Sequence, residues 1–138
     1  MTEVNMLAVL VAAVGTFIIG GAWYSPLLFV KPWMAANNYT PERMEAMKHD
    51  SSPAKAMAVS FVTWLVMAYC FAVLLSWTGL QGWLGGVKLG LLLWVGFAAA
   101  VLLVGNMFSD RKFMAFVIDA GYALVYLVLM GAVLGAWR

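Results

Sequence analysis

The amino-acid sequence predicts an all-α, polytopic integral membrane protein: a bundle of four transmembrane helices with a short interfacial helix in the first loop. Its 138 residues are 65% hydrophobic and 10% charged, and its mean hydropathy is +0.94, whereas soluble domains are about half apolar and a quarter charged. Four apolar runs each reach the roughly 20 residues that a helix needs to cross a bilayer. We therefore expect residues 1–138 to form a single transmembrane domain, with spans at about 4–24, 54–77, 83–108 and 113–137.

The first apolar run, 4–24, is expected to be a retained span and not a cleaved signal peptide. No basic side chain precedes it, it is longer than the apolar part of a signal peptide, and no small-residue cleavage site precedes a polar mature start. The run is therefore counted as the first helix of the bundle.

Two prolines and three aromatic residues characterise the segment that follows this run. Pro26 and Pro32 interrupt any continuous helix, so the chain is expected to turn along the membrane surface. Trp23, Tyr24 and Trp33 are expected to be interface anchors, because amphipathic aromatic side chains collect at the headgroup level.

A helix start is expected later in the same loop, at Thr40-Pro41-Glu42. The triplet combines an N-cap hydroxyl, a proline at the first helical position and an acid in the first turn. It predicts a short helix lying on the membrane surface. Beyond the second span, residues 78–82 are expected to form a tight turn, and residues 109–112 a polar turn into the last span.

The basic residues predict the orientation of the bundle. The loop after the first span holds Lys31, Arg43, Lys48 and Lys55, and the turn after the third span holds Arg111 and Lys112. The opposite side holds only two of the 8 lysines and arginines, Lys88 and Arg138. Lysine and arginine collect on the cytoplasmic side of a membrane. The loop 25–53 is therefore expected in the cytoplasm and both termini outside.

The last apolar run carries Asp119, the only acidic residue well inside any such run. It lies six residues beyond the start of the span, about 9 Å along a helix. Asp119, Tyr122 and Tyr126 have the spacing i, i+3 and i+7, which aligns them on one helical face. Charged groups within a bilayer are costly and are functional candidates by default.

Equal depths in the other spans place Thr16, Ser60 and Thr63 near Asp119. Together with Tyr122 and Tyr126, these residues predict a polar tier that binds an ion, a proton or a substrate. Because a low dielectric disfavours the charged form of an acid, Asp119 is expected to be neutral at pH 7. The alternative is a structural carboxyl, hydrogen-bonded to one of these hydroxyl groups.

Two G-x-x-x-G pairs, Gly86/Gly90 and Gly131/Gly135, indicate close helix packing. A turn centred between Asp110 and Arg111 would place Gly86 opposite Gly135 and Gly90 opposite Gly131. Alternatively, the glycine face of the last span contacts a second copy of the chain, because its opposite face carries the polar stripe. On this ground a homo-oligomer is expected.

The sequence contains few signs of a metal site, a disulfide, an enzyme active site or a nucleic-acid-binding surface. His49 and Asp50 are the only neighbouring acid–base pair, and no second histidine or cysteine accompanies them, so no metal site is expected. Cys70 is the one cysteine and cannot form an intrachain disulfide. No paired-carboxylate or histidine-rich cluster predicts an enzyme, no cofactor is expected, and a net charge of +2 does not predict nucleic-acid binding.

Three blocks of the sequence resemble the DUF1761 family of small, mostly bacterial, four-helix membrane proteins. They are G-A-W-Y-S-P (21–26), K-x-W (31–33) and D-A-G-Y (119–122), and the resemblance extends over nearly the whole chain. It implies the same fold and a multi-pass protein of the bacterial cytoplasmic (inner) membrane. It implies no substrate, cofactor or catalytic residue, because the family has no assigned function.

Two kinds of function therefore remain open. Asp119 and the polar tier favour a proton- or ion-coupled transporter or channel subunit. The small size and the glycine pairs favour a structural or partner-binding membrane protein without transport or catalytic activity.

Overall fold

The computed structural model describes residues 4–40, 42–43 and 53–137 and consists of helices with short connections. Four helical segments are long and apolar enough to cross a bilayer: Met6–Trp23 (α1), most of Pro53–Thr78 (α4), Gly82–Met107, and Phe113–Ala136 (α7). The third segment is continuous but is built from α5 (Gly82–Leu93), a π-helical turn η1 (Trp94–Ala98) and α6 (Ala99–Met107). The predicted four-helix membrane bundle is confirmed, and the chain is a multi-pass membrane protein.

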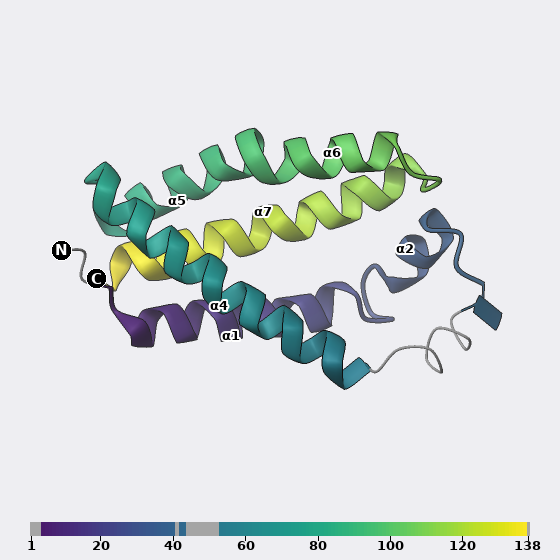
Figure 1. The fold of residues 1–138 in the computed structure, drawn as a ribbon, viewed down its shortest axis with the longest axis horizontal. Coiled ribbons are helices and arrows are strands. Elements are labelled where there is room, and N and C mark those ends of the chain that lie inside the picture. Colours follow the sequence, from purple (N-terminus) through teal and green to yellow (C-terminus); the bar gives the residue numbers. More distant parts are fainter. Residues whose placement is uncertain (1–3, 41, 44–52, 138) are drawn as a thin grey trace.

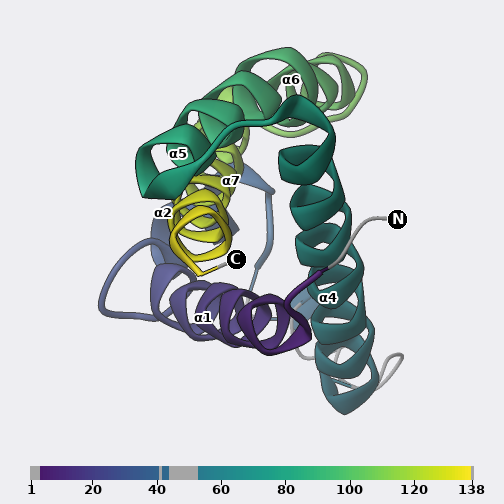
Figure 2. The ribbon, with the colours of Figure 1, turned by 90° about the vertical axis from the view of Figure 1, so that its left-hand side faces the viewer.

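Helix α7 lies at the centre of the bundle (Figures 1 and 2). Helices α5 and α6 pack along one side of α7, and α1 packs along another. Helix α4 crosses α1 and also contacts α7. In the most apolar stretch of 18 residues in α7, 44% of the residues are buried, against 33%, 17% and 11% in the corresponding stretches of the other three spans. The start of α1 and the end of α7 lie together (Figure 1), where Asn5 Nδ2 donates to the carbonyl oxygen of Trp137 at 3.4 Å.

The hydrophobic core lies in the half of the bundle where α1 begins and α7 ends. Its fully buried side chains come from three helices and include Val9, Phe71, Leu75 and Met130. Helices in lipid associate through close van der Waals packing, because the surrounding acyl chains are as apolar as the side chains. The half near the first loop instead contains polar and aromatic groups, which form the candidate site below.

Glycines hold the hairpin of α5 and α7 together. A Cβ atom built on Gly86 would overlap the carbonyl oxygen of Gly131, and one on Gly131 would overlap that of Gly86. Similarly, a Cβ atom on Gly90 would lie 2.6 Å from the carbonyl oxygen of Leu127. The two backbones are in direct contact, so the G-x-x-x-G pairs pack against each other within one chain.

The register of this hairpin differs from the predicted one. Gly86 lies opposite Gly131, one helical turn from the expected Gly135, which instead faces Gly82. The π-helical turn at Trp94–Ala98 accounts for part of this shift. A π-turn adds a residue to a helix at nearly constant length, and this one lies between the glycines and the connecting turn.

Both the glycine face and the polar face of α7 pack against other helices of the same chain. The glycine face contacts α5, and the face bearing Asp119 and Tyr122 contacts α1 and α2 (Val30–Ala36). The interpretation that the glycine face meets a second copy is therefore corrected: it contacts α5. A homo-oligomer stays a prediction, without support from α7.

A short helix that was not predicted lies in the first loop at Val30–Ala36, ahead of the helix start predicted at Thr40, where Glu42 and Arg43 are helical. Pro32 is its third residue, within the first turn, where a missing backbone N–H breaks no intrahelical bond. Of the helix predicted from Thr40, only Glu42 and Arg43 are described; Thr40 Oγ1 accepts from the Arg43 amide at 3.1 Å, as an N-cap does. The remainder of that helix and His49-Asp50 lie outside the described residues.

The predicted orientation can be tested with single cysteines. Leu27, which is 92% exposed beside α2, and Gln81, exposed between α4 and α5, lie at opposite ends of the bundle. In a Cys70→Ala background, an impermeant thiol reagent applied to intact cells is expected to label Gln81→Cys. Leu27→Cys should react only after the cells are permeabilised. The reverse pattern would contradict a cytoplasmic first loop.

Candidate functional site around Asp119

The carboxylate of Asp119 is the shared acceptor of three side chains from three parts of the chain. Tyr24 Oη donates to Oδ1 at 2.6 Å, and Trp33 Nε1 donates to the same oxygen at 3.1 Å. Arg111 Nη1 lies 3.3 Å from Oδ2, forming a salt bridge. The side chains of Arg111 and Asp119 are 30% and 18% exposed. We call these four residues the Asp119 cluster.

Local structure brings each member of the cluster to this point. Tyr24 is the C-cap of α1, where the chain leaves the bundle, and Trp33 lies in the middle of α2. Arg111 precedes α7 by two residues, so its long side chain reaches along the first two turns to Asp119. The ring of Tyr24 packs edge-on against that of Trp33, with centroids 5.6 Å apart. The cluster therefore links α1, α2 and the α6–α7 turn to α7.

Further hydrogen bonds fasten the end of α2 to the same turn. The amide of Lys112 donates to the carbonyl oxygen of Ala36, and Asn38 Nδ2 donates to that of Asp110, both at 2.8 Å. Asn38 has a φ of 61°, a left-handed conformation that asparagine tolerates better than most residues. The buried Asn37 accepts from Arg111 Nη1 at 3.4 Å. The guanidinium group is thereby oriented from two sides.

A second pair of aromatic groups joins α1 to α7, Trp23 beside the cluster and Tyr122 one turn deeper in the bundle. Trp23 Nε1 donates to the carbonyl oxygen of Ile118 at 3.0 Å, and Tyr122 Oη donates to that of Thr16 at 2.7 Å. Gly121 makes room for this arrangement, because a Cβ atom there would lie 3.0 Å from the indole of Trp23. These bonds fix the rotation of α1 against α7, on which the position of Tyr24 depends.

The polar tier predicted from equal depths is not assembled around Asp119. Thr63 is exposed, and its hydroxyl donates to Val59 of its own helix at 2.8 Å. Thr16 is buried, but its hydroxyl likewise donates to its own helix, at Ala12. Helical periodicity gives the depth of a residue but not the rotation of its helix, which turns these hydroxyls away.

The two tyrosines of the predicted stripe also differ from the expectation. Tyr122 bonds Thr16 and not Asp119, and Tyr126 packs against the Tyr122 ring with centroids 4.9 Å apart. Ser60 lies in the wall of a groove that also contains Tyr122. Of the residues predicted to form the ion, proton or substrate site, only Asp119 belongs to the cluster. Its hydrogen-bond partners are Tyr24, Trp33 and Arg111.

The three expected interface anchors point into the protein. Trp23, Tyr24 and Trp33 each donate to α7, and none is more than partly exposed. Their N–H and O–H groups find fixed acceptors in the bundle, so they need not face the lipid headgroups. In the structure these side chains contact α7, and their position at the headgroup level stays a prediction.

Arg111 and two uncharged donors converge on the two oxygens of the Asp119 carboxyl group. The expectation that this acid is neutral at pH 7 stays a prediction. Arg111, Asn37 and Trp94, whose Nε1 donates to Ala120 at 2.8 Å, were not predicted as site residues. Only the proximity of Arg111 to Asp119 along the chain indicated a possible ion pair.

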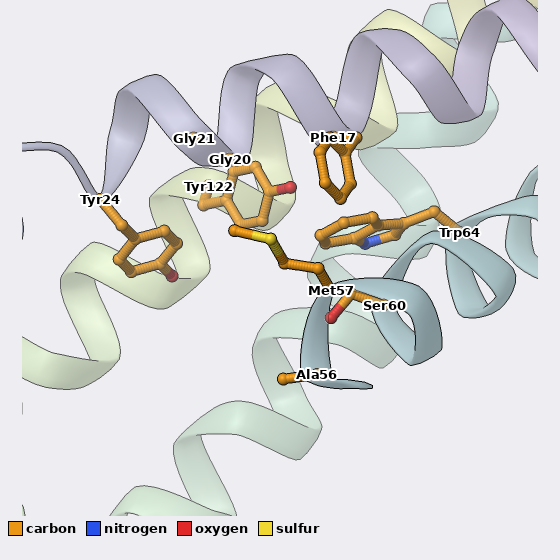
Figure 3. A pocket seen from close by; sticks show the side chains of 9 residues that line it. All are labelled: Phe17, Gly20, Gly21, Tyr24, Ala56, Met57, Ser60, Trp64 and Tyr122. Carbon is orange, nitrogen blue, oxygen red and sulfur yellow. The ribbon is translucent and has the colours of Figure 1, made fainter. Parts of the chain in front are cut away.

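A groove of about 540 Å³ lies beside the cluster, between α1, α4 and α7. Figure 3 shows its lining: the rings of Phe17, Tyr24, Trp64 and Tyr122, together with Gly20, Gly21, Ala56, Met57 and Ser60. In the part of the chain that the structure describes, no three His, Cys, Asp or Glu residues come close enough to hold a metal ion. The chemistry of this region is that of one ion pair beside an aromatic groove.

The sequence blocks that meet here also match a known family. Residues 7–135 match the family described as "Protein of unknown function (DUF1761)". No curated protein and no solved structure matches the sequence. The neighbouring blocks 21–26 and 31–33 supply Tyr24 and Trp33, and the distant block 119–122 supplies Asp119, to one cluster. The match extends over nearly all of the chain, and the protein belongs to the DUF1761 family.

Proposed function

We propose that the protein is a small proton- or ion-coupled transport component in which the Asp119–Arg111 pair acts as a latch. The observation that carries this proposal is that one ionisable carboxylate accepts from Tyr24, Trp33 and Arg111 together. Protonating Asp119 removes the ion pair and weakens both remaining bonds, since a neutral acid is the poorer acceptor. The contacts that Tyr24, at the end of α1, and Trp33, in α2, make with α7 then depend on a single proton.

The use of an ion pair between Asp119 and Arg111 supports a proton-controlled switch and not a purely structural contact. A buried ion pair is weak evidence for stability, because well-packed apolar residues of similar size often stabilise a fold as well or better. The pair is also partly exposed, at 30% for Arg111 and 18% for Asp119. Water at this end of the bundle can therefore exchange a proton with the carboxylate.

Proton flux into liposomes tests the latch. Vesicles containing the protein and a trapped pH-sensitive dye are given a pH gradient, with protein-free vesicles as the baseline. We expect the wild type to dissipate the gradient and Asp119→Asn to slow it at least tenfold, toward the baseline. The amide keeps the size of the acid but cannot exchange the proton.

Asp110→Asn is the matched control for this experiment. It makes the same chemical change at an exposed residue of the adjoining turn, outside the cluster, and should retain the wild-type rate. Flux that is equal in wild type and Asp119→Asn would refute the latch.

The second candidate is a structural membrane protein in which the cluster only fastens α2 to the bundle. It is favoured by one observation: no buried side-chain nitrogen or oxygen of the described residues lacks a hydrogen-bond partner. A wild-type protein that dissipates no gradient of protons, Na⁺ or K⁺, while Asp119→Asn retains its fold, would favour this candidate.

A further inference from the structure

We infer that the groove between α1 and α4 binds one acyl chain of an anionic phospholipid, whose headgroup lies against the basic residues at the same end of the bundle. This site goes beyond the proposed latch: Tyr24 belongs to both the Asp119 cluster and the groove lining, but the ion pair of Asp119 and Arg111 lies outside the lining.

The shape and position of the groove fit a ligand that enters from the bilayer. Its volume of about 540 Å³ is within the usual ~300–1,000 Å³ of small-ligand sites. Gly21, Ala56 and Met57 are exposed at its edge, so it opens between α1 and α4 on the surface that faces lipid. A Cβ atom on Gly21 would meet nothing within 4 Å. The entrance is therefore open space.

The walls of the groove suit an apolar chain with a polar end. Phe17 and Trp64 stand edge to face, with centroids 6.0 Å apart, and Met57 reaches between α4 and the ring of Tyr122 (Figure 3). Thr16 and Thr63 satisfy their hydroxyls within their own helices. The hydroxyl of Ser60, by contrast, makes no hydrogen bond to any described residue. It is therefore able to donate to the ester carbonyl of a lipid.

Charge complementarity selects an anionic headgroup. Lys55 lies in the first turn of α4, directly before the lining residues Ala56 and Met57. Lys31 and Lys112 are exposed at the same end of the bundle. None of the nine lining residues is charged, so the acyl part meets no ionised group. Basic residues beside a groove between transmembrane helices are the usual recognition elements for anionic lipids.

Native mass spectrometry of the purified protein in detergent can test this site. The protein is titrated with phosphatidylglycerol, with phosphatidylcholine of the same acyl chains, and with glycerol phosphate as the free headgroup. We expect a one-to-one complex with phosphatidylglycerol, roughly fivefold tighter than with phosphatidylcholine, since one lysine at the surface contributes about that factor. Glycerol phosphate should not bind.

Two pairs of variants locate the lipid. Gly21→Leu fills the entrance and should weaken binding at least tenfold, whereas Gly105→Leu, at an equally open glycine on α6, should not. Lys55→Gln should abolish the preference for phosphatidylglycerol, whereas Lys88→Gln, on α5, should retain it. Equal binding of both lipids, or binding that Gly21→Leu leaves unchanged in a folded protein, would overturn the inference. Tighter binding of a lipophilic cation such as tetraphenylphosphonium would overturn it as well.

Discussion

Replacing Gly131 by alanine is expected to destabilise the bundle by about 3 kcal/mol or more, at the upper end of the usual cost of overpacking a core. The added methyl group would overlap the carbonyl oxygen of Gly86. A backbone atom cannot rotate away as a side chain can, so α5 and α7 must separate along several turns. Gly86→Ala should have a similar effect, because its methyl group would overlap the carbonyl oxygen of Gly131.

Gly105→Ala is the control for this prediction. A Cβ atom at Gly105 would meet nothing within 4 Å, and alanine favours a helix over glycine by about 0.5–1 kcal/mol. Titration with sodium dodecyl sulfate, followed by circular dichroism, measures the loss of folded protein. Should Gly131→Ala unfold at the same detergent fraction as Gly105→Ala, the backbone contact of the hairpin would be wrong.

Replacing Asp119 by leucine is expected to cost about 2–3 kcal/mol of folding free energy. The substitution removes the acceptor of Tyr24 and Trp33 and leaves the charge of Arg111 without its partner. Unsatisfied buried donors cost about 1–3 kcal/mol each, and an unpaired buried charge more. Because Arg111 is partly exposed, water offsets some of this loss.

Asp119→Asn and Asp110→Leu calibrate that measurement. The asparagine retains an acceptor oxygen but loses the ion pair, so it should cost roughly 1 kcal/mol. Asp110 is exposed, and Asp110→Leu should remain within about 0.5 kcal/mol of the wild type. If Asp119→Leu were as stable as the wild type, the cluster would contribute nothing to the fold. That result would also count against the latch, which requires these bonds to hold α1 and α2 to α7, whereas the proton flux of Asp119→Asn tests proton transfer separately.

The spans were predictable because a bilayer leaves the backbone few options. Every peptide group in the hydrocarbon needs an internal hydrogen bond, so a long apolar run becomes a helix. The run predicted at 4–24 corresponds to Met6–Trp23, and the last one, predicted at 113–137, to Phe113–Ala136. The π-helical turn at Trp94–Ala98 left no sign in the hydropathy.

The partners of Asp119 were not predictable in the same way. Spacing along the chain places Asp119, Tyr122 and Tyr126 on one face of a helix. It does not say which helix that face meets, nor how that helix is rotated. Tyr24 lies 95 residues from Asp119 and Trp33 lies 86. Both had been interpreted as anchors in the headgroup region, which is also a common place for such residues.

By itself the sequence determined that the protein has four apolar helices, one acid within the last of them, and glycines spaced for close packing. The tertiary structure decided what these features contact. Backbone contact between Gly86 and Gly131 sets the hairpin register, and the bond from Tyr122 to Thr16 sets the position of α1. Only then does Asp119 lie within reach of Tyr24 and Trp33. Local rules act over a few residues, whereas these contacts depend on how whole helices pack against one another.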